Sequence, residues 1–177
     1  MNDVTLGRFT FRLTACHMVT YFVAGIFALA LFDYQSLFAA SPFLRPLDSA
    51  WIAAGPALQV FRGLIFALAL YPFRAVFLGQ PRGWMKLWGL FLGLAIFSTA
   101  GPAPGSVEGL IYTRLAFTDH LRGLPEVVLQ TLALSALAVA WHRRPHRAWN
   151  IVMGGLMVVV ILMSLAGVFL ERPEGLR

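Results

Sequence analysis

Five apolar runs dominate this sequence, and each is close to the length that a helix needs to cross a membrane. The hydrocarbon core of a bilayer is about 30 Å thick, which takes about 20 residues of α-helix. The third and fourth runs are slightly short, and the fifth has the purest apolar character. The runs cover residues 13–32, 52–71, 84–100, 126–141 and 149–170. We therefore predict an all-α integral membrane protein: a five-transmembrane-helix bundle that occupies residues 1–177 as a single polytopic domain.

The composition excludes a soluble domain. Hydrophobic residues make up 59% of the chain and charged residues only 12%, with a mean hydropathy of +0.74, whereas soluble proteins carry about 25% charged residues. The apolar surface must therefore face the lipid bilayer or other apolar helices. The first run is longer than the core of about 7–15 residues in a signal peptide, so we expect it to be retained as a helix. The single cysteine, Cys16, excludes an internal disulfide and a multi-cysteine metal site.

The basic residues indicate how the bundle is oriented. The net charge of +6 does not predict a nucleic-acid partner, because the basic residues gather at the ends of apolar runs. Eight fall on the side of the N-terminus: Arg8, Arg12, Arg74, Arg82, Lys86, Arg143, Arg144 and Arg147. Five fall on the other side: Arg45, Arg114, Arg122, Arg172 and Arg177. Cytoplasmic loops are enriched in Lys and Arg, so we predict a cytoplasmic N-terminus.

Two further compositional features support a membrane location. All five tryptophans fall near predicted span ends, as in the aromatic belts of membrane proteins; they are Trp51, Trp84, Trp88, Trp141 and Trp149. All but one of the 14 basic residues are Arg, and Ala, Leu and Gly are abundant. This usage is typical of bacteria, and we expect the bacterial cytoplasmic (inner) membrane.

Residues 98–126 form the longest interruption between apolar runs. Pro102 and Pro104, with the glycines beside them, prevent a continuous helix at the start of this stretch. We expect a non-helical entry, one or two short helices over residues 101–124, and a new helix that opens at Pro125. By the charge distribution, this partly helical loop is non-cytoplasmic. Its ionisable residues are Glu108, Arg114, Asp119, His120, Arg122 and Glu126.

Arg62 is the most informative single residue, because it lies within the second apolar run. A guanidinium near the middle of a span costs about 2.5–3.5 kcal/mol on insertion scales and keeps its charge. Helical side chains lean toward the N-terminus, so Arg62 should reach toward residues 98–126, with Gln59 on the same helix face. Two interpretations follow. Arg62 either binds a small anion or lipid headgroup, or forms a structural ion pair with Glu108, Asp119 or Glu126.

Glu126 and Gln130 project from one face of the fourth predicted helix, because they are four residues apart. Glu126 follows Pro125, where a carboxylate complements the helix dipole. It is therefore a helix-capping group, a proton acceptor or the partner of Arg62. Together with Gln59 and Arg62, these residues predict a polar pocket covered by the loop of residues 101–124.

Acid–base or metal chemistry is an alternative for the loop. Asp119 and His120, with Glu108, Arg122 and Glu126 nearby in sequence, contain the side chains that such sites use. However, no HExxH or paired-histidine spacing is present, and a local salt bridge between Asp119 and Arg122 explains the pattern as well. We predict no catalytic residues and no metal ligands.

His17 and His142 raise the alternative of haem binding, because both are expected near the cytoplasmic leaflet. A lone buried histidine is more often a hydrogen-bonded structural residue, so we predict no cofactor. Gly89 and Gly93 form a GxxxG pattern in the third run. In a chain with several helices, we expect such pairs to serve packing within the bundle.

Three functions fit the sequence. The first is an accessory or scaffold subunit of a membrane complex, with a membrane-protein partner or self-association, because short loops and apolar faces leave little else exposed. The second is a binder or carrier of a small anion or lipid headgroup through Arg62 and residues 98–126. The third is a membrane-embedded acid–base or metal enzyme that uses His120 and Glu126.

Overall fold

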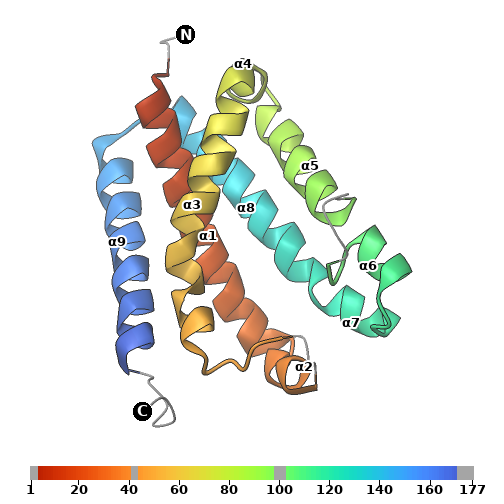
Figure 1. Cartoon of the computed structure of the whole chain (residues 1–177). Helices are drawn as coiled ribbons and strands as arrows, with labels where there is room; N and C mark the ends of the chain where they lie inside the picture. Colours follow the sequence, from red (N-terminus) through yellow and green to blue (C-terminus); the bar gives the residue numbers. More distant parts are fainter. Residues whose placement is uncertain (1–3, 41–43, 98–102, 171–177) are drawn as a thin grey trace.

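The computed structural model describes residues 4–40, 44–97 and 103–170, and every regular element within these ranges is helical (Figure 1). The longer helices are α1 (Leu6–Leu31), α3 (Ala50–Leu70), α5 (Gly83–Ile96), α8 (Leu124–Arg143) and α9 (Arg147–Leu170). The shorter ones are α2 (Tyr34–Ala40), the 3₁₀ helix η1 (Tyr71–Phe73), α4 (Arg74–Leu78), α6 (Val107–Tyr112) and α7 (Phe117–Arg122).

Four stretches of the described chain are long and apolar enough to cross a membrane: Leu6–Leu31, Ala50–Leu78, Phe117–Arg143 and Arg147–Phe169. The all-α prediction is confirmed for the described residues, and four of the predicted spans correspond to these stretches. The third predicted span corresponds to α5, an apolar helix of 14 residues. At 1.5 Å per residue α5 is about 21 Å long, which is less than the thickness of the hydrocarbon core.

The first helix begins at Leu6 rather than at residue 13, where the apolar run starts. Arg8 and Arg12 were expected to precede the helix, but both lie within it. Arg12 is buried, and its guanidinium lies 5.6 Å from the centroid of the Trp141 ring, an arrangement that stabilises a cation by the ring quadrupole. This aromatic partner allows the charged residue to enter the helix, which the hydropathy pattern alone does not reveal.

Helix α1 is the centre of the bundle. It contacts α3, α8 and α9, while α9 also packs on α3 and α5 packs on α8. Every residue from Arg12 to Met18 is buried, so this part of α1 is enclosed on all sides, as expected for a central helix. Its main apolar neighbours include Leu134 and Ala138 of α8.

The closest approach between α1 and α3 is at Gly63. A Cβ atom added to Gly63 would lie 2.8 Å from the Cα of Thr14, which is shorter than real Cβ contacts allow. Small residues permit such backbone approach between membrane helices. The side chains on either side of this crossing are therefore brought within contact distance.

The GxxxG pattern on α5 is not used for packing within the described bundle, contrary to our expectation. No heavy atom lies within 4 Å of a Cβ built at Gly89 or Gly93. The buried face of α5 consists instead of Gly83, Leu87 and Phe91. This face is turned away from the glycine pair, which leaves the pair open.

The helix connections separate to the two ends of the bundle (Figure 1). The start of α1, helix α4 and the α8–α9 connection lie at one end, which we call the basic end. These segments, together with the turn before α5 and the first turn of α5, carry the eight basic residues that were grouped together from the sequence. Helices α2 and α7 lie toward the opposite end, and α6 lies on the flank of the bundle, beyond the far end of α5.

The α1–α3 crossing predicts that Gly63→Ala destabilises the bundle. A methyl group has no space against the Thr14 backbone, and overpacking of this kind costs about 1–3 kcal/mol. Gly55→Ala, in the same helix, is the matched control because nothing lies within 4 Å of its Cβ position. Thermal unfolding in mild detergent should show a lower melting temperature for Gly63→Ala and an unchanged or higher one for Gly55→Ala. Equal melting temperatures for the two variants would contradict this account of the crossing.

Candidate functional site

A cavity of about 300 Å³ lies where α1, α3, α5 and α8 meet. We call it the Arg62 pocket. Its polar lining comes from His17 and Tyr21 of α1, Arg62 of α3, and Glu126, Gln130 and Thr131 of α8. Its apolar lining consists of Phe66, Phe91, Leu94, Ala95, Val127 and Leu134. Three of the four residues expected in a polar pocket therefore line one cavity, and the fourth, Gln59, contacts the lining residue His17.

Arg62 has no ion pair or hydrogen bond among the described residues. Its guanidinium lies 5.5 Å from the centroid of the Phe66 ring, four residues further along α3. The predicted ion pair with Glu108, Asp119 or Glu126 is thus not formed within the described chain. The side chain is exposed at the surface of the bundle, although it lies in the middle of a candidate span.

The three candidate carboxylates are positioned elsewhere. Glu126 accepts a hydrogen bond of 2.5 Å from the hydroxyl of Tyr34. Asp119 forms the expected local salt bridge with Arg122, at 3.6 Å. Glu108 lies in the first turn of α6, where a carboxylate complements the helix dipole. Only Glu126 shares the pocket with Arg62.

The contact between Tyr34 and Glu126 ties α2 to the start of α8. Burial, followed by the hydrogen bond to Glu126, raises the pKa of the Tyr34 phenol well above its usual range. The phenol therefore stays protonated and remains a donor to Glu126. No sequence signal indicated a role for Tyr34, because α2 is a short helix in a connection between predicted spans.

His17 and Gln59 form the polar link between α1 and α3. The side-chain carbonyl of Gln59 lies 3.1 Å from His17 Nε2, and the Gln59 amide nitrogen donates to the Gly55 carbonyl at 3.3 Å. With this assignment Nε2–H of His17 is the donor, and Nδ1 carries a lone pair. Nδ1 is buried and has no hydrogen-bond partner among the described residues. His17, which lines the pocket and is only 1% exposed, therefore carries an unused acceptor.

His120 belongs to the loop and not to the Arg62 pocket. Its Nδ1 accepts a hydrogen bond of 3.0 Å from the Gly105 backbone N–H, and Nε2 lies 3.3 Å from the hydroxyl of Thr113. Thr113 in turn donates to the Gly109 carbonyl at 2.7 Å. Both ring nitrogens are therefore engaged in holding α6 and α7 together. Glu108, Asp119 and Arg122 likewise do not line the pocket.

The described residues contain no group of three or more His, Cys, Asp or Glu side chains that could hold a metal ion. The two histidines that we considered as haem ligands lie at different positions along the length of α1. His142 packs against Phe9, with 5.3 Å between ring centroids, and its Nδ1 lies 2.7 Å from the Ala138 carbonyl. His17 lies two turns further along α1, in the Arg62 pocket.

Comparisons with protein-family models, curated proteins and solved structures give no match to this chain. The site is therefore interpreted from its own chemistry. It combines a permanent cation, a carboxylate held by a phenol, a buried acceptor on His17 and an apolar wall. These groups offer contacts for an amphipathic molecule that carries an acidic group. Sequence reasoning considered His17 only as a haem ligand and did not place His17 or Tyr21 in this pocket, although their spacing of four residues puts both on one helix face.

The Tyr34–Glu126 contact predicts that Tyr34→Phe destabilises the protein. A hydrogen bond to a charged acceptor contributes about 1.5–3 kcal/mol, and the substitution removes only the donor. Tyr112→Phe is the matched control, because Tyr112 is 72% exposed. The effect should also depend on pH. The folded-state pKa of Tyr34 is raised, so the stabilisation is complete below about pH 10, where an unfolded tyrosine titrates, and declines above it.

Melting temperatures between about pH 7 and pH 11 therefore test both statements. The difference between wild type and Tyr34→Phe should shrink at the alkaline end, whereas Tyr112→Phe should follow the wild type throughout. A Tyr34→Phe variant that matches wild type at neutral pH would show that the hydrogen bond contributes nothing.

Proposed function

We propose that this chain binds an amphipathic ligand whose acidic group pairs with Arg62. The observation that carries the proposal is the absence of a counter-charge on Arg62 among the described residues. A guanidinium at the middle of a span is costly to leave unpaired in lipid and does not lose its proton. An acidic ligand supplies the missing charge, and the planar guanidinium suits bidentate contact with a carboxylate or phosphate.

The remainder of the pocket supports an amphipathic ligand. Phe66, Phe91 and Leu94 form an apolar wall beside the cation, which accommodates a hydrocarbon chain. His17 Nδ1 offers an acceptor, and Glu126 places a second acceptor at the same cavity. A headgroup that carries both an acidic group and a hydrogen-bond donor would satisfy all three polar side chains.

A second candidate is an accessory subunit of a membrane complex. It is favoured by the open Gly89–Gly93 pair on α5, because glycine pairs allow another helix to approach closely. In that case, a carboxylate from the partner would neutralise Arg62. Both candidates require an external anion at Arg62, and they differ in whether it belongs to a small molecule or to a protein.

We also propose that α5 crosses the membrane, so that the chain forms five spans in a bacterial inner membrane with a cytoplasmic N-terminus. The α4–α5 connection lies at the basic end, and α6 follows beyond the other end of α5, toward the end that holds α7 (Figure 1). A short apolar helix crosses by local thinning of the bilayer or by snorkelling of flanking residues. Lys86 and Trp84 near the start of α5 suit such an interfacial position.

Ligand binding is tested by native mass spectrometry of protein extracted in mild detergent, with titration of dihexanoyl phosphatidic acid and of inorganic phosphate. Arg62→Leu should weaken binding of the phosphatidic acid by about 10- to 100-fold, since a charge-assisted hydrogen bond is worth about 1.5–3 kcal/mol. The affinity of Arg62→Lys for the phosphatidic acid should lie between those of the wild type and Arg62→Leu, because an ammonium group lacks the planar fork of a guanidinium. Arg114→Leu, an exposed arginine outside the pocket, is the control for loss of charge.

The outcomes separate the candidates. Binding of inorganic phosphate alone would identify a small anion rather than a lipid headgroup. A second polypeptide that is lost from Arg62→Leu but kept by Arg114→Leu would favour the subunit. Equal binding by wild type and Arg62→Leu would remove Arg62 from the site.

Topology is tested with single cysteines in a Cys16→Ala background. Thr118 in α7 and Ala148 at the start of α9 are both exposed and belong to opposite ends of the bundle. Thr118→Cys should react with a membrane-impermeant maleimide added to intact cells, and Ala148→Cys should react only after lysis. The reverse pattern would mean either that the N-terminus lies outside the cytoplasm or that α5 does not cross, and it would overturn the five-span arrangement. Equal labelling of both would mean that α8 does not cross, which would also contradict it.

A further inference from the structure

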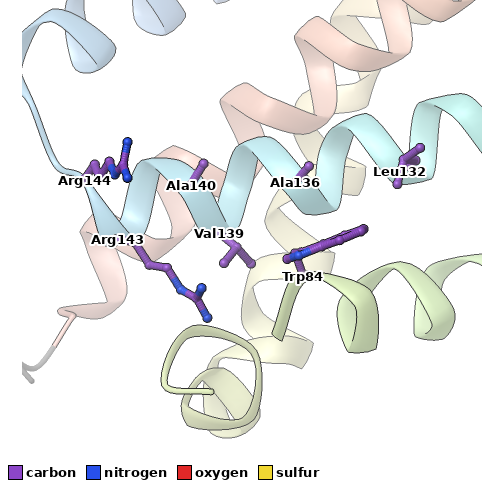
Figure 2. Close-up of a pocket in the computed structure, with 7 residues that line it drawn as sticks. All are labelled: Trp84, Leu132, Ala136, Val139, Ala140, Arg143 and Arg144. Atoms are coloured by element: carbon purple, nitrogen blue, oxygen red, sulfur yellow. The ribbon is translucent and has the colours of Figure 1, made fainter. Parts of the chain in front are cut away.

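A second cavity, of about 520 Å³, lies between the start of α5 and the last three turns of α8 (Figure 2). We call it the Trp84 groove. One side is a stripe on α8 with a spacing of four residues: Leu132, Ala136, Ala140 and Arg144. Trp84 of α5 and Val139 and Arg143 of α8 complete the lining. None of these residues lines the Arg62 pocket, so the two cavities are separate.

The groove is apolar along its length and basic at one end. Ala136 and Ala140 are exposed, so their small side chains leave a channel beside the indole of Trp84. The arginines follow at the end of α8, which lies at the basic end of the bundle. An acyl chain along the alanines would therefore place a headgroup at Arg143 and Arg144. Tryptophan is also typical of the level of lipid headgroups.

Arg143 and Arg144 differ in the hydrogen bonds that their side chains form. Arg143 donates to the backbone carbonyls of Gln80 and Pro81, the latter at 3.1 Å, and so ties the end of α8 to the turn before α5. Figure 2 shows its side chain extending toward that segment. A guanidinium has five N–H donors, so others remain for a ligand. Arg144 has no partner among the described residues.

Among the described residues, the segments that surround the groove supply no carboxylate to neutralise them. The sequence contains no Asp or Glu between Asp48 and Glu108, and none between Glu126 and Glu171. The segments that surround the groove, α4, α5, the end of α8 and the start of α9, fall within these two intervals. The groove therefore presents uncompensated positive charge next to an apolar channel.

We propose that the Trp84 groove binds an anionic phospholipid of the leaflet at the basic end. Its phosphate contacts Arg144, while Arg143 adds positive charge at the same end of the groove, and one acyl chain lies over Ala136 and Ala140 beside Trp84. Basic pockets between membrane helices bind such headgroups. A helix from a second copy is a poorer occupant. In a symmetric contact it would bring its own Arg143 and Arg144 to a place without carboxylates, and like charges repel.

The test uses full-length protein in nanodiscs of equal parts phosphatidylglycerol and phosphatidylcholine, released into a native mass spectrometer. The wild type should retain phosphatidylglycerol in preference to phosphatidylcholine. Arg144→Gln should reduce the retained phosphatidylglycerol by at least fivefold. Arg147→Gln is the matched control, because Arg147 is exposed at the same end but does not line the groove. It should retain as much as the wild type.

A second variant tests the channel without altering charge. Ala140→Leu fills the groove, and it should also lose phosphatidylglycerol although both arginines remain. Its fold is checked by circular dichroism, and Arg144→Gln provides the test if Ala140→Leu does not fold, because Arg144 is exposed and makes no contact. Equal losses in Arg144→Gln and Arg147→Gln would indicate diffuse attraction and overturn the proposal. A protein dimer that disappears in Ala140→Leu, with lipid unchanged, would assign the groove to a second copy instead.

The two sites are distinguished by a parallel Arg62→Leu measurement. That variant should keep the phosphatidylglycerol bound at the groove, because Arg62 does not line it. Loss of the same lipid in Arg62→Leu would mean that the Arg62 pocket, and not the groove, holds it.

Discussion

Gly63 of α3 lies so close to Thr14 of α1 that a methyl group at position 63 would meet the Thr14 backbone at 2.8 Å. This contact determines which side chains meet on either side of it. His17 is one turn along α1 from Thr14, and Gln59 is one turn along α3 from Gly63, so the two are brought to hydrogen-bond distance. On the other side of Gly63, Phe66 packs against the His17 ring with 5.1 Å between centroids. The floor of the Arg62 pocket is therefore a consequence of the helix crossing.

The same crossing explains why Arg62 faces outward. Gly63 points at α1, and successive residues in a helix are separated by about 100°. Arg62 is consequently turned away from α1 and is exposed at the side of the bundle. The guanidinium forms no ion pair among the described residues, and the one carboxylate that lines the pocket, Glu126, accepts a hydrogen bond from Tyr34. The absence of a counter-charge among the described residues is the observation from which we propose an external acidic ligand, and it links the fold to the proposed function.

The sequence predicts the helices well because lipid imposes a simple requirement. Runs such as 149–170 contain no charged residue, and α9 follows that run closely. Arg62, Glu126 and Gln130 were also found from sequence, because a charge within an apolar run and a spacing of four residues are local signals. Tyr34 was not found, since its partner Glu126 lies 92 residues away and nothing local marks it. The His17–Gln59 link was missed for a similar reason, because it depends on how α1 and α3 are aligned at Gly63.

Helix α8 carries both proposed sites, and its geometry keeps them apart. Gln130 lines the Arg62 pocket and Leu132 lines the Trp84 groove. A separation of two residues corresponds to about 200° around a helix, so the two side chains leave α8 on nearly opposite faces. Between these faces, Ser135 and Ala138 are buried at the level where α8 packs on α1. A ligand on either face can therefore contact α8 without displacing the side chains that hold it to the bundle. Because neither cavity shares a lining residue with the other, a substitution in one is expected to change binding there and leave the second site intact, which allows each to be assigned by its own variants.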